Sequence, residues 1–203
     1  MSNVKLNENG TILVNGVILS YPHLYEPYSQ NGQKGKYSAK FLLPKATHKD
    51  AIVAINKVIE KMSVEKWKQK LPPTNLFLKN GELVAKNEGD ENYFFLSASE
   101  TVRPKVVDRD GRTPIPEEDA EGKIYPGAIV DVLINPWAQD NQYGRKINAN
   151  LLAVRFREKG ERLAGGRVEV NTADVFEDIS GAFGDDGDGF GGLALQVPLG
   201  LFD

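Results

Sequence analysis

The amino-acid sequence predicts a mainly β fold, a small barrel with extra hairpins and one inserted α-helix. Short segments that alternate apolar and polar residues, separated by Gly, Asn and Pro turns, are typical of strands. One stretch carries apolar residues at three- and four-residue steps, the spacing of an amphipathic helix. From Val168 onward the chain loses this periodicity and gains glycine. We therefore expect an ordered domain over residues 1–170 and a flexible tail over 171–203.

The N-terminal part predicts three strands joined by turns. The first two lie within "GTILVNGVILSYPHLYEP", with a turn at Asn15-Gly16 between them and an end near Pro22. The third lies within "KGKYSAKFLLP", where apolar residues alternate with a basic face that includes Lys36 and Lys40. This strand should be buried on one side only.

The inserted helix should begin at Thr47, which has the residue type of an N-cap and an acid, Asp50, three residues further on. His48 falls in the first turn and is expected to face solvent. The apolar positions share one side of the helix and should pack on the sheet: Ile52, Ile55, Ile59 and Met62, with Val58 beside them. Lysines cover the other side, and Pro72-Pro73 should end the helix.

After the helix the sequence again predicts strands. Hairpins are expected around Asn80-Gly81 and Asp110-Gly111. Two β-branched strands follow, in "GAIVDVLINPW" and "RKINANLLAVRF", joined by the loop "AQDNQYG".

Charge is distributed unevenly along the chain of 203 residues, whose net charge is −3. The residues after Arg167 contain eight acids and no base, a charge of −8, so the remainder has 25 bases, 20 acids and a charge of +5. A basic body with an acidic tail indicates nucleic-acid binding or a regulatory tail. A tail that serves only solubility is the alternative.

The sequence offers little support for an enzymatic function. Without cysteine, the chain has no disulfide framework, thiol nucleophile or cysteine-based zinc site, and its two histidines lack metal-ligand spacing. Neither a phosphate-binding loop nor a dinucleotide fingerprint is present, and the acids of 117–121 form a run typical of solvated loops. No cofactor or metal is expected. The polar N-terminus and the lack of a long apolar run predict neither a signal peptide nor a membrane span.

Binding of single-stranded nucleic acid has better support, because it needs cations along the backbone and flat side chains on which bases stack. Three segments interleave these two residue types, and strand faces add further cations. The candidate DNA-binding residues are Tyr28, Lys34, Lys36, Lys40, Arg103, Lys105, Trp137, Tyr143, Arg145, Lys146, Arg155 and Arg157. Trp137 could equally close the core. The loops that carry Tyr25 to Lys36 and Trp137 to Lys146 are expected to flank a groove.

Three blocks of sequence resemble the single-stranded DNA-binding proteins of tailed bacteriophages, of the Enterobacter-phage type. These blocks are "SASETVRPKVVDRDGRTPI", "IYPGAIVDVLINPWAQDNQYGRKINANLLAVRF" and "GERLAGGR". The resemblance covers roughly 14–167 and implies an oligonucleotide/oligosaccharide-binding (OB) fold, a five-stranded barrel. It also implies non-specific binding of single-stranded DNA in phage replication or recombination, in the host cytoplasm, and an acidic C-terminal tail.

The tail is expected to compete with DNA or to recruit replication or recombination proteins, through Asp185, Asp186, Asp188 and Phe202. It departs from related tails because its end, "LALQVPLGLFD", is mostly apolar. Two other functions stay open at this point: a non-enzymatic phage interaction module whose tail mimics nucleic acid, and a metal-dependent nuclease. The sequence does not decide between DNA and RNA, nor whether the chain forms a homodimer.

Overall fold

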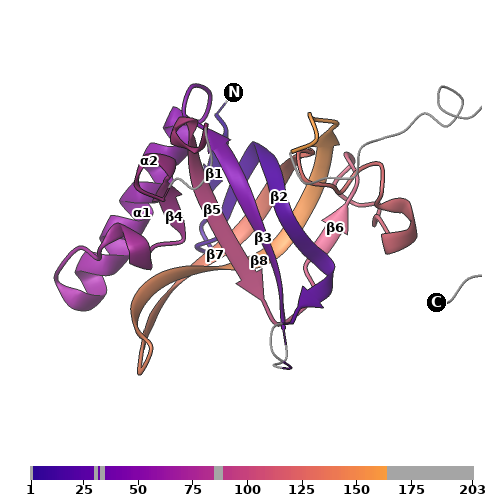
Figure 1. The fold of residues 1–203 in the computed structure, drawn as a ribbon. Coiled ribbons are helices and arrows are strands. Elements are labelled where there is room, and N and C mark those ends of the chain that lie inside the picture. The colour runs from indigo at the N-terminus through magenta and orange to yellow at the C-terminus, as the bar shows by residue number, and fades with distance from the viewer. Residues whose placement is uncertain (1, 30–31, 33–34, 85–88, 164–203) are drawn as a thin grey trace, which may run out of the picture. The chain divides into compact units, whose positions relative to one another are not determined.

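The computed structural model describes residues 2–29, 32, 35–84 and 89–163. Within them eight strands form one sheet (Figure 1). The strands are β1 (Val4–Leu6), β2 (Ile12–Tyr28), β3 (Lys36–Pro44), β4 (Leu78–Asn80), β5 (Tyr93–Glu100), β6 (Lys105–Val107), β7 (Ile129–Asn141) and β8 (Gly144–Glu158). The helices are α1 (Lys49–Trp67) and α2 (Gly81–Val84), with single 3-10 turns at Pro73–Asn75, Asp90–Asn92 and Glu117–Asp119.

The predicted mainly β class with an inserted helix is confirmed. Hydrogen-bonded neighbours run in the order β4-β5-β3-β2-β7-β8-β6, with β1 added to β2. The order begins at β4 and ends at β6, so the described part of the sheet is open and coiled rather than closed. The five long strands alone follow the order β5-β3-β2-β7-β8, which suits a partly open OB-type barrel. The predicted boundary at residue 170 lies outside the described residues.

The hydrophobic core fills the inside of the coiled sheet. Each long strand contributes a fully buried side chain, Val17, Phe41, Leu96, Ile134 and Leu151 among them. In Figure 1 β5, β3 and the second half of β2 lie in front of β7 and β8. Side chains that alternate with the buried ones therefore face outward from the front or the back of the sheet.

Helix α1 packs its predicted apolar stripe against this core. Ile52, Ile55 and Ile59 are buried, as the three- and four-residue spacing predicts. The helix ends at Trp67, earlier than the prolines, because Lys68 adopts a left-handed conformation (φ 59°) and its N–H bonds to the carbonyl of Val64. No helix in the described ranges is long and apolar enough to span a membrane.

The predicted capping by Thr47 is wrong, because His48 occupies the N-cap position without a side-chain cap bond. His48 is also buried rather than exposed, with 4% of its surface accessible. Its Nε2 lies 2.9 Å from the carbonyl oxygen of Asn15, so this nitrogen carries the proton, and Nδ1 accepts from the hydroxyl of Thr47 at 2.9 Å. The imidazole thus joins the start of α1 to β2.

The turn predicted at Asn15-Gly16 is a β-bulge instead. β2 runs without interruption, and its register against β7 shifts between Val14 and Val17. Gly16 has a φ of +69°, a conformation that glycine adopts without strain. The Asn-Gly pair, which is typical of turns, therefore forms a bulge within one continuous strand.

Asp131 on β7 holds this bulge. Its Oδ1 accepts the N–H of Gly16 at 2.9 Å and Nε of Arg157 at 2.7 Å. Its Oδ2 accepts Nε of Arg155 at 2.7 Å. The aspartate side chain is 1% exposed, whereas both arginines keep more than a third of their side chains in solvent. Charge-assisted hydrogen bonds of this kind are stronger than neutral ones, so the buried carboxylate connects β7, β2 and β8 firmly.

Of the two further predicted hairpins, one is absent and one is present. Asn80-Gly81 does not form a hairpin, because β4 leads directly into the one-turn helix α2. Asp110-Gly111 does reverse the chain: Val107 and Pro114 form an antiparallel bridge, and the N–H groups of Asp108 and Ile115 donate to the carbonyls of Thr113 and Val106. The carboxylate of Asp110 closes this turn with bonds from the Thr113 hydroxyl and nearby backbone N–H groups, which lower the pKa of Asp110 to about 2.

Replacing Asp131 by alanine is expected to lower the free energy of unfolding by about 2 kcal/mol, because hydrogen bonds to charged groups are lost. Urea unfolding followed by circular dichroism measures this change. The control is Glu65→Ala, which removes an exposed carboxylate 3.9 Å from Lys61 and should change stability by less than about 0.5 kcal/mol. Equal effects of both substitutions would contradict the role assigned to Asp131.

Candidate nucleic-acid interface

Three basic or polar residues of β3 line its outer face. Lys36, Ser38 and Lys40 alternate with residues that point into the core, as the sequence predicts. Register places Lys36 opposite Tyr28 of β2, and Lys40 between Ser20 of β2 and Ser97 of β5. The outer surface of β2, β3 and β5 is called the front face below, after its orientation in Figure 1.

Lys40 lies between two aromatic rings of the front face. Its Nζ is 5.3 Å from the ring centroid of Tyr21 and 5.3 Å from that of Phe95. Both distances are within the range of cation–π attraction, so the ammonium is held in place over the sheet. Tyr21 is 68% exposed and Phe95 is nearly buried, so Tyr21 is the ring that a ligand would meet.

A second aromatic pair lies further along the same face. The rings of His23 and Tyr28 are 4.8 Å apart at an interplanar angle of 45°. Tyr28 is 53% exposed, and Lys36, directly opposite, is also exposed. Two exposed tyrosines, each with a lysine nearby, thus follow one another along β2 and β3.

The β7–β8 hairpin carries four more of the candidates. Tyr143 lies in its tight turn and is 74% exposed, while Trp137 is 38% exposed on the strand. Nε of Arg145 is 3.7 Å from Oδ1 of Asp140. Lys146 lies opposite Gln139 in the strand register. Trp137 alternates with the buried or half-buried residues of its strand, so it is not a fully buried core residue.

The surface of this hairpin that carries Asp140 and Arg145 is anchored to the body. Nε1 of Trp67 donates to Asp140 at 2.7 Å, and Nζ of Lys66 donates to the carbonyl of Ala138 at 3.0 Å. Asn75 donates to the carbonyl of Arg145 at 2.9 Å. The end of α1 and the segment after it therefore hold the hairpin at a fixed angle.

Lys105 is the first residue of β6, Arg103 lies two residues before it, and both are exposed. The Arg103 guanidinium is 4.9 Å from the ring of Tyr25, whose hydroxyl donates to the carbonyl of Ile115 at 2.9 Å. Burial raises the pKa of Tyr25 to about 12, against the opposing effect of Arg103 and with a smaller contribution from Glu117. Tyr25 is thus a structural support for Arg103.

Arg155 and Arg157 lie elsewhere, on the outer side of β8, where both bind Asp131. In the sheet, β2 and β7 separate β8 from β3. Both arginines are held at the β7–β8 pair by Asp131 rather than by a residue of the front face. Lys34 and the tail residues Asp185, Asp186, Asp188 and Phe202 lie outside the described residues.

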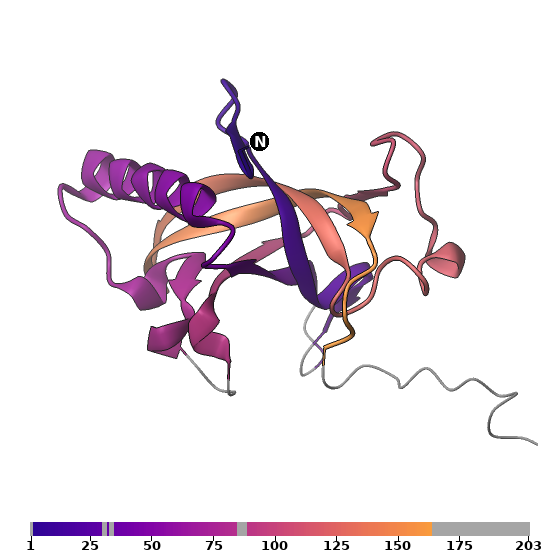
Figure 2. The ribbon, with the colours of Figure 1, turned by 90° about the horizontal axis from the view of Figure 1, so that it is seen from above.

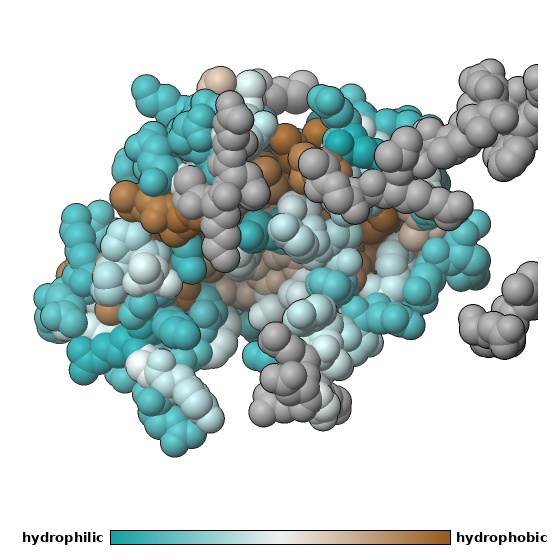
Figure 3. All heavy atoms as spheres, in the orientation of Figure 1, coloured by the Kyte–Doolittle hydropathy of each residue, from teal (hydrophilic) through white to brown (hydrophobic). Residues whose placement is uncertain are grey.

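Sequence reasoning missed Tyr21, His23 and Phe95, although they share the front face with predicted residues. Tyr21 precedes a proline within an unbroken strand, and its φ of 46° accompanies a register shift that no local pattern reveals. Figure 3 shows the side of the molecule seen in Figure 1, with weakly polar and apolar residues in the middle and hydrophilic residues around them. In the described ranges, no group of three or more His, Asp or Glu residues is arranged to hold a metal ion.

Comparisons with known proteins identify the relatives of this chain. The family model described as "Enterobacter phage Enc34, ssDNA-binding protein" matches residues 10–188. "Putative protein p50" of Acyrthosiphon pisum secondary endosymbiont phage 1 is 32% identical over 180 residues, covering 83% of this chain and 94% of that protein.

Solved structures are similar as well. The single-stranded DNA-binding protein from bacteriophage Enc34 in complex with ssDNA is 36% identical, with a TM-score of 0.73 over 81% of this chain and 95% of that one. The single-stranded DNA-binding protein gp2.5 of bacteriophage T7 shares the fold at 15% identity, with a TM-score of 0.50 over 82% of this chain and 100% of that one. Family model, curated relative and structure coincide: the chain belongs to the Enterobacter phage Enc34 family of ssDNA-binding proteins.

Proposed function

We propose that this protein binds single-stranded DNA without sequence preference along the front face and the β7–β8 hairpin, and that it does no chemistry on the DNA. The observation that carries the proposal is the alternation of exposed tyrosines with lysines across β2 and β3. Tyr28 lies opposite Lys36, and Tyr21 lies against Lys40.

Each residue type has a separate role in this binding. Lys36 and Lys40 neutralise phosphates, which makes the affinity depend on salt. Tyr21 and Tyr28 stack on bases, each stack being worth about 1–3 kcal/mol. Paired bases in a duplex are already stacked and cannot offer their faces, so the protein prefers single strands.

The remaining candidates extend this path. Trp137 and Tyr143 provide further rings on the hairpin, with a cation from Lys146 on the surface of Trp137 and one from Arg145 on the opposite surface, beside Asp140. Arg103 offers an exposed charge against Tyr25 of β2, and Lys105 offers one on β6. Arg155 and Arg157 contribute to long-range attraction at most, because both are engaged by Asp131.

The relative from bacteriophage Enc34 supports the proposal, since its structure was determined in complex with ssDNA. We place the function in phage DNA replication or recombination, within the cytoplasm of the host, where single strands need protection. Residues 171–203, with a net charge of −7 from seven acids, compete for the same cationic surface or recruit partner proteins.

Substituting Tyr21 by alanine is expected to weaken binding of oligothymidine by about 1–3 kcal/mol. Lys40→Ala should weaken it less at high salt than at low salt and reduce the slope of log affinity against log salt by about 0.7, the value for one phosphate contact on a single strand. Fluorescence anisotropy at several salt concentrations measures both effects. The matched control is Lys61→Ala, an exposed lysine on α1, for which no loss is expected; a loss equal to that of Lys40→Ala would count against the front face.

Removing the acidic charge of the tail is expected to tighten binding of single-stranded DNA, most at low salt, because a competing polyanion is lost. Two variants test this: a chain ending at Thr172, and the full-length chain with Asp185, Asp186 and Asp188 replaced by asparagine. The same anisotropy titration provides the measurement. Unchanged affinities for both variants would return the tail to a role in solubility.

A further inference from the structure

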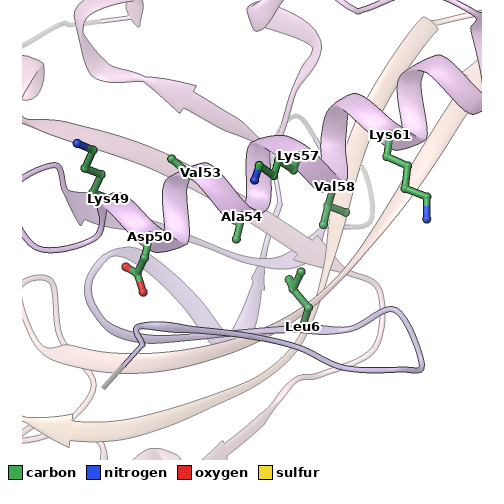
Figure 4. Close-up of a pocket in the computed structure, with 8 residues that line it drawn as sticks. All are labelled: Leu6, Lys49, Asp50, Val53, Ala54, Lys57, Val58 and Lys61. Atoms are coloured by element: carbon green, nitrogen blue, oxygen red, sulfur yellow. The ribbon is translucent and has the colours of Figure 1, made fainter.

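An open groove of about 880 Å³ lies between β1 and α1 (Figure 4). Its lining combines apolar and charged side chains, which are Leu6, Val53, Ala54, Val58, Lys49, Lys57, Lys61 and Asp50. Figure 4 shows Leu6 of β1 facing the helix, with the lysines spread along the helix above it. The groove belongs to neither the front face nor the β7–β8 hairpin.

Two apolar side chains of this groove, Leu6 and Val53, are not part of the core. Leu6 is 51% exposed and Val53 is 46% exposed, whereas the core-facing residues Ile52 and Ile55 are buried. Helix α1 therefore presents a second apolar surface, on a side that the amphipathic pattern would leave polar. Adjacent exposed aliphatic side chains bordered by charges are typical of a binding surface.

The charged border is positive. No ion pair engages Lys49 or Lys57 within the described residues, and Lys61 makes only a loose one, 3.9 Å from Glu65. Asp50, the one acid of the lining, is already occupied by the Ser2 hydroxyl at 2.7 Å and the N–H of Asn3 at 3.0 Å. The lysines thus have no carboxylate of the groove available to them.

The same bonds fix the shape of the groove. Asp50 joins the start of α1 to the residues just before β1, and the side-chain amide of Asn3 donates to the carbonyl of Thr47 at 2.7 Å. The wall that carries Leu6 is therefore tied to the helix before any ligand arrives. A site whose walls are already ordered loses less conformational entropy when a ligand binds.

We propose that this groove docks a short segment of a partner protein that carries aliphatic side chains next to carboxylates. Leucine- or valine-like side chains would fill the floor at Leu6, Ala54 and Val58 and extend over Val53 at the edge of the groove, and the carboxylates would pair with Lys49 and Lys57. Single-stranded DNA fits less well, because none of the lining residues is aromatic and bases would have no ring to stack on. The groove extends the proposed function from DNA binding to recruitment of a protein by the DNA-bound molecule.

The test uses the full-length protein and a short fluorescent peptide built from leucine and aspartate, with a matched peptide in which asparagine replaces aspartate. Val53→Asp places a negative charge in the lining of the groove, which repels the carboxylates of the acidic peptide and should weaken its binding by about tenfold. Val64→Asp is the matched control, because Val64 is 42% exposed on the same helix but does not line the groove. Val64→Asp should change peptide affinity by less than about twofold, because a residue that does not contact the bound peptide affects its binding little. Both variants should keep the wild-type melting temperature and affinity for oligothymidine.

Five outcomes would overturn the proposal. The acidic peptide fails to bind, or it binds no better than the asparagine peptide. Val53→Asp and Val64→Asp weaken peptide binding equally. Val53→Asp weakens oligothymidine binding, which would make the groove part of the DNA interface and separates this failure from failure of the proposed function. Neutralising Asp185, Asp186 and Asp188 tightens peptide binding, which would assign the groove to the chain's own acidic segment.

Discussion

The structure depends on the buried carboxylate of Asp131. It binds the N–H of Gly16 at the bulge of β2 and the guanidinium groups of Arg155 and Arg157 on β8. The bulge lies in the half of β2 that pairs with β7. Pairing of β2 with β3 begins just after it, at Ile18. Because β2 joins the two halves of the sheet, this tie positions the strand on which Tyr21 and Tyr28 are carried.

Positive charge serves two separate purposes in the chain. On β8 the arginines neutralise a buried acid and contribute to the fold. On β3 the lysines have aromatic neighbours and no acid partner in the described residues, so their charge remains available to a ligand. A count of basic residues does not distinguish the two cases, whereas the position of one aspartate does.

The sequence predicted the class of fold and the basic face of β3 because both follow from local periodicity, as at Lys36, Lys40 and the stripe of α1. Its errors came where tertiary contacts override local preference. Asn15-Gly16 has the composition of a turn, but Asp131, distant in sequence, converts it to a bulge. Arg155 was correctly placed on an outward face, yet its partner could not be inferred without the register of β7 against β8. Tyr21 was missed because its exposure arises from an irregularity within β2.

The proposed function makes the body of the protein a salt-sensitive binder of single strands. A titration of labelled oligothymidine and of a duplex of equal length with the full-length protein, at low and at high salt, tests this property. We expect tighter binding to the single strand at both concentrations and a steep loss of affinity as salt increases. Affinity that does not change with salt, or that is higher for the duplex, would contradict it.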